Sequence, residues 1–397
     1  MGNTVFNREH VDIMNEPMFL GSGLGIARYD IQRHQVFEEL IEKSLSFFWR
    51  PEEISLATDR IQYLNMSDVE KRFFTENLRY QTLLDSIQGR APARVFGPIV
   101  SDPTLDTWLQ TWTFSETIHS RSYTHIMRNC FIDPASEFDQ IIDNPAIMKR
   151  AESIGQYYDD VLYWIRKYEN AKEDLRYWEE EVLHHYWEER DDQTELDDAR
   201  RFFEDTKRDL MASIYLCAHC VNALEAIRFY VSFACTFSFA ERGLLEGNAK
   251  IMKFIARDEQ LHLKGTQYII RQWQTGVDGD EWKQIAEELE GEATKIFLDV
   301  VEQEKEWVDH LFAMGAIPNL SPEILKTYVE YLADSRMRAA GLKSPFSVRR
   351  HPLPWMRKWL NSDEVQNAAQ EVEIMYLVSQ VNTDLTDDDY NRFGKYL

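Results

Sequence analysis

The stretch Ser115-Glu-Thr-Ile-His-Ser-Arg-Ser-Tyr123, read with Glu259-Gln-Leu-His262 further along the chain, decides the fold. Each contains the pattern Glu-x-x-His inside a long segment with helical periodicity: Glu116 with His119, and Glu259 with His262. On a helix, residues i and i+3 are about 60° apart in projection and about 4.5 Å apart along the axis, so a carboxylate and an imidazole can bind one ion together. One such pair is common by chance. Two pairs, with an additional acid upstream of each, are typical of a di-metal carboxylate site inside a helix bundle.

The additional acids are Asp85, in Leu83-Leu-Asp-Ser-Ile87, and Glu225, in Asn222-Ala-Leu-Glu-Ala-Ile227. Each lies about one helix and one connection before a Glu-x-x-His pair. Both interrupt strongly apolar sequence, where an ionised carboxylate costs several kcal/mol unless a cation compensates it. We therefore predict that both acids are metal ligands.

The charges of this ligand set match two divalent ions, because four carboxylates balance them and the two histidines bind as neutral nitrogen donors. Oxygen and imidazole ligands favour iron or manganese over zinc. The ligand types do not decide between Fe and Mn.

Tyr123 follows His119 by four residues and therefore lies on the same helix face, one turn further along. Phe229, Phe233 and Ile255 stand at helical spacing from two of the other predicted ligands, and we expect them to surround the phenol. A phenoxyl radical needs this setting, close to a strong oxidant and shielded from water. Taken alone, these residues would be ordinary core.

Two further residues are predicted to act beside the metals. Asp258 immediately precedes a ligand, and an acid bonded to a ligand histidine orients the ring and tunes the metal. We expect Asp258 to bond His119. Trp49, which we expect to end the first long helix before Pro51, is predicted to extend that chain toward the surface.

The composition favours an all-α protein. Among 397 residues, 16 Gly and 12 Pro are few, and continuous β-type alternation is absent. We predict an N-terminal arm over 1–30, one helical domain carrying the metal site over 31–345, and a C-terminal segment with a flexible tail over 346–397. The charged 178–200 stretch is predicted to be a solvated helical hairpin tip. Helices are expected from residue 32 to the residues before Pro51, and over 68–89, 101–130, 144–178, 200–239, 248–274, 281–314 and 322–340.

Charge and cysteine usage exclude several classes of protein. A net charge of −24 opposes binding to phosphate backbones, so we predict no nucleic-acid partner. No uninterrupted apolar run reaches the roughly 18 to 20 residues that span a bilayer, and the first residues do not form a signal peptide. The four cysteines, including Cys217-Ala-His-Cys220, are predicted to be buried and structural rather than redox-active or zinc-binding. These features predict a soluble cytoplasmic protein.

The chain resembles the small (beta) subunit of class I ribonucleotide reductase over about residues 16–385. The strings that carry the resemblance are Asn15-Glu-Pro-Met-Phe19, Ser46-Phe-Phe-Trp-Arg-Pro51, Leu83-Leu-Asp-Ser-Ile-Gln-Gly-Arg90, Ser115–Tyr123, Asn222-Ala-Leu-Glu-Ala-Ile-Arg-Phe229 and Ala256-Arg-Asp-Glu-Gln-Leu-His262. The resemblance implies a ferritin-like helix bundle. It also implies that O2 and a di-iron site generate a radical, with which a large subunit reduces ribonucleoside diphosphates to deoxyribonucleoside diphosphates.

The resemblance implies a role for each matching residue. Asp85, Glu116 and His119 would bind one ion, and Glu225, Glu259 and His262 the other. Tyr123 would hold the stable radical, and Trp49 and Asp258 would link the cluster to the partner interface. Tyr376 would relay the radical from the tail.

The resemblance also implies cofactors and partners. These are two Fe ions per chain, with Mn an alternative, a large (alpha) subunit bound through the C-terminal tail, a second copy of this chain, O2, and an external electron donor for cluster assembly. Overall similarity favours the iron-using class Ia branch. The stretch Glu371-Val-Glu-Ile-Met-Tyr376 and the ending Phe393-Gly-Lys-Tyr-Leu397 depart from the family pattern, so Tyr390 and Tyr396 remain alternatives for the tail tyrosine.

Two other functions use similar ligands. A di-iron oxygenase or soluble desaturase oxidises a substrate directly and needs neither a tyrosine at position 123 nor a detachable tail. Ferritin-like iron storage usually occurs in a much shorter chain that forms a hollow shell, and the length of this chain opposes it.

Overall fold

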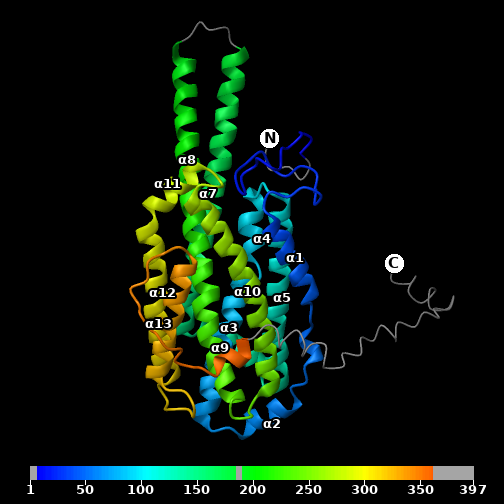
Figure 1. The fold of residues 1–397 in the computed structure, drawn as a ribbon, viewed down its shortest axis with the longest axis vertical. Helices are drawn as coiled ribbons and strands as arrows, with labels where there is room; N and C mark the ends of the chain where they lie inside the picture. Colours follow the sequence, from blue (N-terminus) through cyan, green and yellow to red (C-terminus); the bar gives the residue numbers. More distant parts are fainter. Residues whose placement is uncertain (1–6, 185–189, 361–397) are drawn as a thin grey trace, which may run out of the picture. The chain divides into compact units, whose positions relative to one another are not determined.

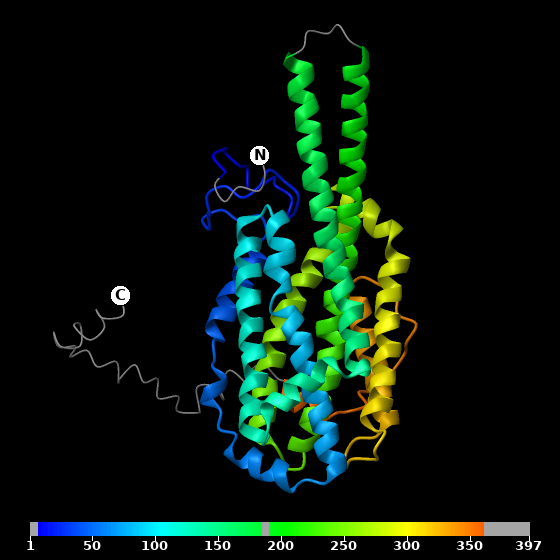
Figure 2. The same ribbon diagram turned by 180° about the vertical axis from the view of Figure 1, so that it is seen from behind.

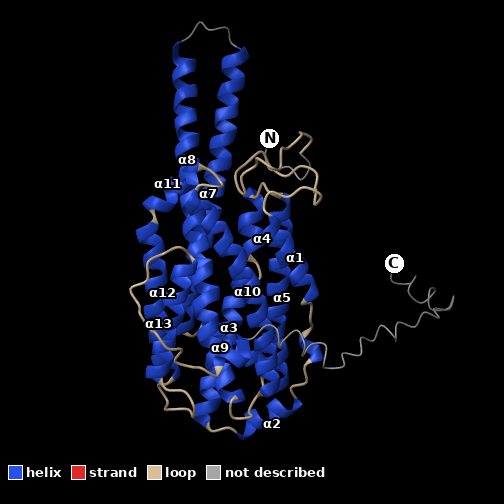
Figure 3. Ribbon diagram, in the orientation of Figure 1, coloured by secondary structure: helices blue, strands red, loops and turns tan. Residues whose placement is uncertain are grey.

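The structure is a computed structural model, and it describes residues 7–184 and 190–360, without the side chains of 181–193. The chain divides into residues 1–360 and 361–397, and the second part lies outside the described residues. Within the described part the regular elements are helices, and strand pairing is limited to two isolated bridges, Phe19 with Val100 and Ile317 with Leu320 (Figure 3). The predicted all-α fold is confirmed.

Four long helical stretches run side by side through the middle of the bundle (Figure 1). These stretches carry every predicted metal ligand. One of the stretches consists of three consecutive helical elements. Their bounds are α3 (Asp68–Gln88), α5 (Pro103–Cys130), α10 (Glu246–Thr275), and the run α8 (Arg190–Ala223), η3 (Leu224–Arg228) and α9 (Phe229–Ala240).

The remaining helices surround this centre or close its ends. In the view from behind, α7 and α8 form an antiparallel hairpin that extends past the other helices of the bundle (Figure 2). The bounds are α1 (Gln35–Ser46), η1 (Pro51–Glu53), α2 (Ala57–Asn65), α4 (Ala91–Phe96), η2 (Gly97–Ile99), α6 (Pro134–Ile142), α7 (Pro145–His184), α11 (Asp280–Glu288), α12 (Glu290–Leu311), α13 (Pro322–Ala339) and α14 (Met356–Leu360).

Local sequence explains where the ligand-bearing helices begin. Ser67 caps α3 through a capping box, in which its side chain accepts from the Glu70 N–H and the Glu70 side chain accepts from the Ser67 N–H. Asp102 caps α5 by accepting from the N–H groups of Thr104 and Leu105, at 2.9 and 2.8 Å. These caps fix the first turn of the helices that present Asp85 and Glu116.

Three helix predictions differ from the structure. The first helix ends at Ser46, so Trp49 lies in the connection before η1 rather than at a helix end. The predicted 281–314 helix is two helices, because the chain bends at Leu289, which ends α11 and begins α12. The short helices α2, α4, α6 and α14 were not predicted, and each has fewer than ten residues.

The predicted 200–239 helix contains a π-helical turn, η3, at Leu224–Arg228. A π turn holds one more residue than an α turn and is common at functional sites. Here it includes Glu225. The same long stretch contains a window with mean hydropathy 1.5, apolar enough to cross a membrane, but 83% of that window is buried inside the protein. Because most of the window is buried inside the protein, we interpret this stretch as a core helix.

Candidate metal centre

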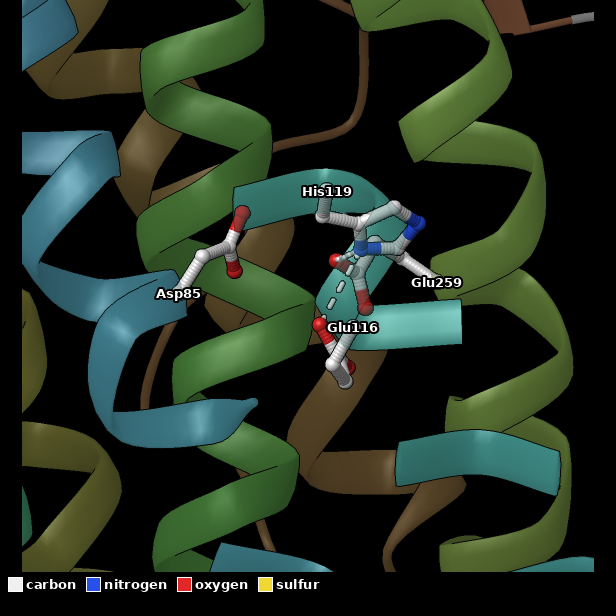
Figure 4. Close-up of side chains that lie close together, drawn as sticks. All are labelled: Asp85, Glu116, His119 and Glu259. Carbon is white, nitrogen blue, oxygen red and sulfur yellow. Dashed lines mark hydrogen bonds and ion pairs between the residues drawn. The ribbon is translucent and has the colours of Figure 1, made fainter. Parts of the chain in front are cut away.

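The bundle brings all six predicted metal ligands together. They come from four elements, and each side chain is at most 1% exposed. Their ligand atoms form two groups, each within 4.8 Å: Asp85, Glu116, His119 and Glu259 in one, drawn in Figure 4, and Glu116, Glu225, Glu259 and His262 in the other.

Glu116 and Glu259 belong to both groups and lie between the two imidazoles. The Oε2 and Oε1 atoms of Glu116 are 3.0 and 3.1 Å from Nδ1 of His119 and of His262. The Oε1 and Oε2 atoms of Glu259 are 3.3 and 3.0 Å from the same two nitrogens. The sequence predicted each glutamate for one ion only. The geometry instead fits two carboxylates that bridge a pair of ions, with Asp85 at one end and Glu225 at the other.

Protons take the place of cations when the cluster holds no ion. Burial opposes charge on Glu116, but His262 and His119 lower the pKa of this carboxyl to about 2. Burial would also lower the pKa of His262, but Glu116 and Glu259 raise it to about 10. For His119, the carboxylates of Glu116, Asp258 and Glu259 outweigh burial and raise the pKa well above its usual value.

The two end carboxylates give the strongest evidence that these residues suit a cation. Burial and the negative charge of Glu116 raise the pKa of Asp85, and burial and the charge of Glu259 raise the pKa of Glu225. Both oxygens of Asp85 and Oε2 of Glu225 have no hydrogen-bond partner among the described residues. Buried oxygens are normally satisfied, so these atoms, facing imidazole nitrogens and other carboxylates, fit divalent cations of the iron and manganese type.

Three neighbouring residues orient the ligands and were not predicted. Trp112, one turn before Glu116, donates its Nε1–H to Oε1 of that ligand at 2.9 Å. Gln88 donates to Oε1 of Glu225 at 2.7 Å and accepts from the hydroxyl of Tyr158, also at 2.7 Å. Helical spacing from Glu116 and Asp85 could have suggested Trp112 and Gln88, whereas nothing in the sequence pointed to Tyr158.

Asp258 and Trp49 make the contacts that the sequence predicted, although Trp49 lies after the end of the first helix. Nε2 of His119 is 3.3 Å from Oδ2 of Asp258, and Trp49 donates its Nε1–H to the same oxygen at 2.8 Å. Arg257, which was not predicted, donates to the other oxygen of Asp258 at 3.0 and 3.1 Å and to the carbonyl of Phe47 at 2.6 Å. This chain of contacts leaves Nδ1 of His119 free to face the metal centre.

Tyr123 is fully buried, as are Phe229, Phe233 and Ile255. Burial and the nearby negative charge of Asp85 raise the pKa of Tyr123 well above its usual value, so the phenol is protonated. Its hydroxyl has no hydrogen-bond partner among the described residues. The phenol is therefore beside the metal centre and shielded from water.

The remaining predicted residues are the tail tyrosines, which lie outside the described part, and the four cysteines, which are unreactive. Tyr376, with the alternatives Tyr390 and Tyr396, lies within 361–397 and outside the described residues. The four cysteines are buried and free, and burial raises the pKa of Cys220 to about 12, which keeps it an unreactive thiol.

Comparison with known proteins agrees with this site. The family model described as "Ribonucleotide reductase, small chain" matches residues 28–352. The chain is 57% identical over 398 residues to the ribonucleoside-diphosphate reductase subunit beta of Enterobacteria phage T4, covering 99% of this chain and 100% of that protein. It is 48% identical over 394 residues to the ribonucleoside-diphosphate reductase 1 subunit beta of Escherichia coli O157:H7, with the same coverage.

Solved structures show the same fold. The ribonucleotide reductase R2 subunit from Clostridium botulinum superposes with a TM-score of 0.69 at 23% identity, over 91% of this chain and 98% of that one. The dimanganese(II)-NrdF structure from Streptococcus sanguinis gives 0.60 at 19% identity, over 84% and 98%. The extent of the family match and the full-length identity to the curated relatives place this chain in the ribonucleotide reductase small-chain family, whose members are beta subunits of an oxidoreductase.

Proposed function

We propose that this chain generates and stores a radical on Tyr123, which the large subunit uses to reduce ribonucleoside diphosphates. Membership of the small-chain family implies a large-subunit partner and a dimer. The observation that carries the proposal is the shielded Tyr123 phenol beside a buried cluster of four carboxylates and two imidazoles.

The six clustered residues are the proposed ligands of two iron ions, and oxidation of such ions by O2, with an electron from an external donor, supplies a one-electron oxidant. Asp85 and His119 would hold one ion, and Glu225 and His262 would hold the other. Glu116 and Glu259 would be ligands of both ions, because each carboxylate lies within 3.3 Å of both imidazoles. Manganese has the same ligand preferences, and metal analysis of purified protein distinguishes the two.

Oxidation of Tyr123 removes one electron and releases the phenolic proton. The carboxylate whose charge acts most strongly on this phenol is Asp85, which we propose as the proton acceptor. Phe229, Phe233 and Ile255 are fully buried. We propose that they exclude water from the phenol, which would prolong the life of the radical.

Asp258 and Trp49 are proposed to carry the electron between the metal centre and the partner interface. The contacts that support this route are His119 to Asp258 and Asp258 to Trp49. Tyr376 in the C-terminal segment 346–397 is the proposed relay to the large subunit, which this segment binds. The complex is proposed to act in the cytoplasm.

The test is Tyr123→Phe, with Tyr328→Phe as a matched control, because Tyr328 is equally buried and its hydroxyl also has no hydrogen-bond partner among the described residues. After anaerobic Fe(II) loading and exposure to O2, Tyr123→Phe should bind two irons but show no tyrosyl EPR signal and no turnover with the large subunit. Tyr328→Phe should keep both. Full activity of Tyr123→Phe would refute the radical assignment and favour direct oxidation of a substrate, as in an oxygenase.

A further inference from the structure

A small apolar cavity lies in the bundle core between α5, α8 and α10. Its volume, counted as the space open to the centre of a water-sized molecule, is about 10 Å³. That is close to the least space that one small molecule occupies. The cavity is lined chiefly by aromatic and aliphatic side chains, among them Leu109, Ala218 and Val221.

The cavity offers water no partner. The polar side-chain atoms at its wall are engaged elsewhere: the Thr266 hydroxyl with Asn222 and with the His262 carbonyl, and the Nε1–H of Trp273 with Asp278. A buried water needs two to four polar partners, so an apolar site of this kind stays dry. A small apolar molecule gives up no hydrogen bond with water on entering this cavity.

The inner wall of the cavity contacts the metal centre. Trp112 lines the cavity with its ring, and the same ring donates its N–H to Glu116 at 2.9 Å. The ring centroid of Trp112 is 5.4 Å from that of His262, and Thr266, also in the wall, lies one helical turn after His262. A single indole therefore separates the cavity from a ligand of each ion.

The outer wall leads toward the surface. Phe19 lines this cavity and also a larger surface pocket of about 520 Å³ beside the loop after α10. Phe19 packs against Trp273, with ring centroids 5.7 Å apart, and Trp273 stacks on Trp282 of the surface pocket at 4.4 Å. Phe19 lies in an irregular segment rather than a helix, held by the Met18 N–H to Asp278 bond at 3.0 Å. Phe19, a side chain outside the helices, thus forms part of the wall of both spaces.

We propose that the cavity is a dioxygen-binding site, and that O2 passes from the surface pocket past Phe19 into it and then past Trp112 to the metal centre. This inference rests on the proposed reaction of the centre with O2. The chemistry that would recognise O2 here is the absence of polar partners, in a space close to the least that one small molecule occupies.

Occupancy is tested without any metal. In metal-free full-length protein with labelled methyl groups, dissolved O2 under pressure accelerates the relaxation of methyl protons near the sites it occupies. The Ala218 and Val221 methyls should be accelerated several-fold more than those of Ile147 and Leu210, which are equally buried but outside the cavity. Equal acceleration of all four would overturn the proposal.

Two variants should change this signal in opposite directions. Ala218→Leu fills the cavity and should remove the selective acceleration at Val221. Phe19→Ala opens the wall to the surface pocket and should increase the selective acceleration at Val221. The matched control for Ala218→Leu is Ala171→Leu in the α7–α8 hairpin, an equally buried alanine that does not line the cavity, and it should behave as the wild type.

The same variants test the route in the iron-loaded protein. In stopped-flow mixing with O2, Ala218→Leu should lower the apparent second-order rate constant at least tenfold, while iron content and the final amount of radical stay unchanged. Phe19→Ala should leave the rate unchanged or raise it. An unchanged rate in Ala218→Leu would overturn the route. If wild-type protein formed no radical at all, the proposed function would fail, yet the metal-free measurement would still decide whether the cavity binds O2.

Discussion

Two buried charge clusters lie on either side of the π turn η3, and they are balanced in different ways. The first is the metal centre, to which η3 contributes Glu225. The second, here called the Glu304 cluster, consists of Glu304, Arg228, Arg150 and Tyr80, and η3 contributes Arg228 to it. Glu304 accepts from Tyr80 at 2.6 Å and from Arg228 at 3.0 Å, and its carboxylate is 3.8 Å from Nε of Arg150.

The difference lies in where the positive charge comes from. In the Glu304 cluster two guanidinium groups face one carboxylate, and guanidinium stays protonated in proteins. In the metal centre, four carboxylates face two imidazoles that must lose their protons before their nitrogens bind a metal. The positive charge of the Glu304 cluster is supplied by the chain itself, whereas the metal centre needs added cations. A buried cluster therefore points to a cation when its carboxylates outnumber its permanent positive charges.

The largest expected effect is in the Glu304 cluster. Glu304→Gln should lower the free energy of unfolding by about 3–5 kcal/mol, because it leaves Arg228 and Arg150 buried without a counter-charge. Urea denaturation measures it. Glu302→Gln, an exposed acid on the same helix, should change stability by less than about 0.5 kcal/mol. The folded fraction of Glu304→Gln should still bind two metal ions, and loss of metal there would show that the clusters are not independent.

Glu116→Gln should act on metal binding. It removes a charge that lies between both imidazoles, so the affinity for both ions should fall by at least about 100-fold, or about 2.7 kcal/mol. Anaerobic Fe(II) titration measures this. The control is Asp59→Asn, a buried acid that instead accepts the N–H groups of Gly247 and Asn248. Loss of only one ion in Glu116→Gln would contradict a bridging role.

His219 is a third kind of buried polar group, uncharged and without a hydrogen-bond partner among the described residues. Burial lowers its pKa to about 3, so the folded state binds a proton less readily than the unfolded state, whose histidine pKa is about 6.5. Its contribution to stability is complete above pH 6.5 and is lost as pH falls toward 3. Between pH 7 and pH 5 the loss is about 2 kcal/mol.

His219→Phe should remove that part of the pH dependence, because phenylalanine does not titrate and keeps the ring contacts with Tyr215 and Phe297. Denaturation of both proteins at pH 7 and pH 5 is the measurement. Parallel loss of stability in the two proteins would show that His219 is not the titrating group.

The smallest effect is expected on the α7–α8 hairpin. Arg200 and Glu179 are 3.7 Å apart with side chains 51% and 47% exposed, so water screens the pair. Arg200→Ala should change the free energy of unfolding by less than about 0.5 kcal/mol. A change above 2 kcal/mol would mean that exposed pairs matter here as much as the buried clusters.

The sequence predicted the helical fold and the clustering of the proposed metal ligands well, because both leave local signals. Glu-x-x-His places its two side chains on one face of a helix whatever the surroundings, and an acid in an apolar segment has few stable environments other than a metal site. Asp85, Glu116 and His262 were therefore identifiable from local spacing and polarity alone.

The missed features depend on distant contacts. The positions of Glu116 and Glu259 between the two imidazoles follow from how α5 and α10 face each other, which spacing along one helix does not reveal. Tyr158 reaches the centre only through Gln88. The π turn was missed because Leu224–Arg228 has no local sequence signal, and its geometry is stabilised by the buried partners of Glu225 and Arg228 rather than by propensity.

The π turn also constrains how this helix can be altered. Because a π turn holds one residue more than an α turn, deleting one residue from Leu224–Arg228 would allow ordinary α-helical geometry while the later side chains of α9 keep their faces. Every side chain of α9 is buried, so the core around this helix would stay packed. The change would fall on Glu225 and Arg228, the side chains that this turn contributes to the two charge clusters.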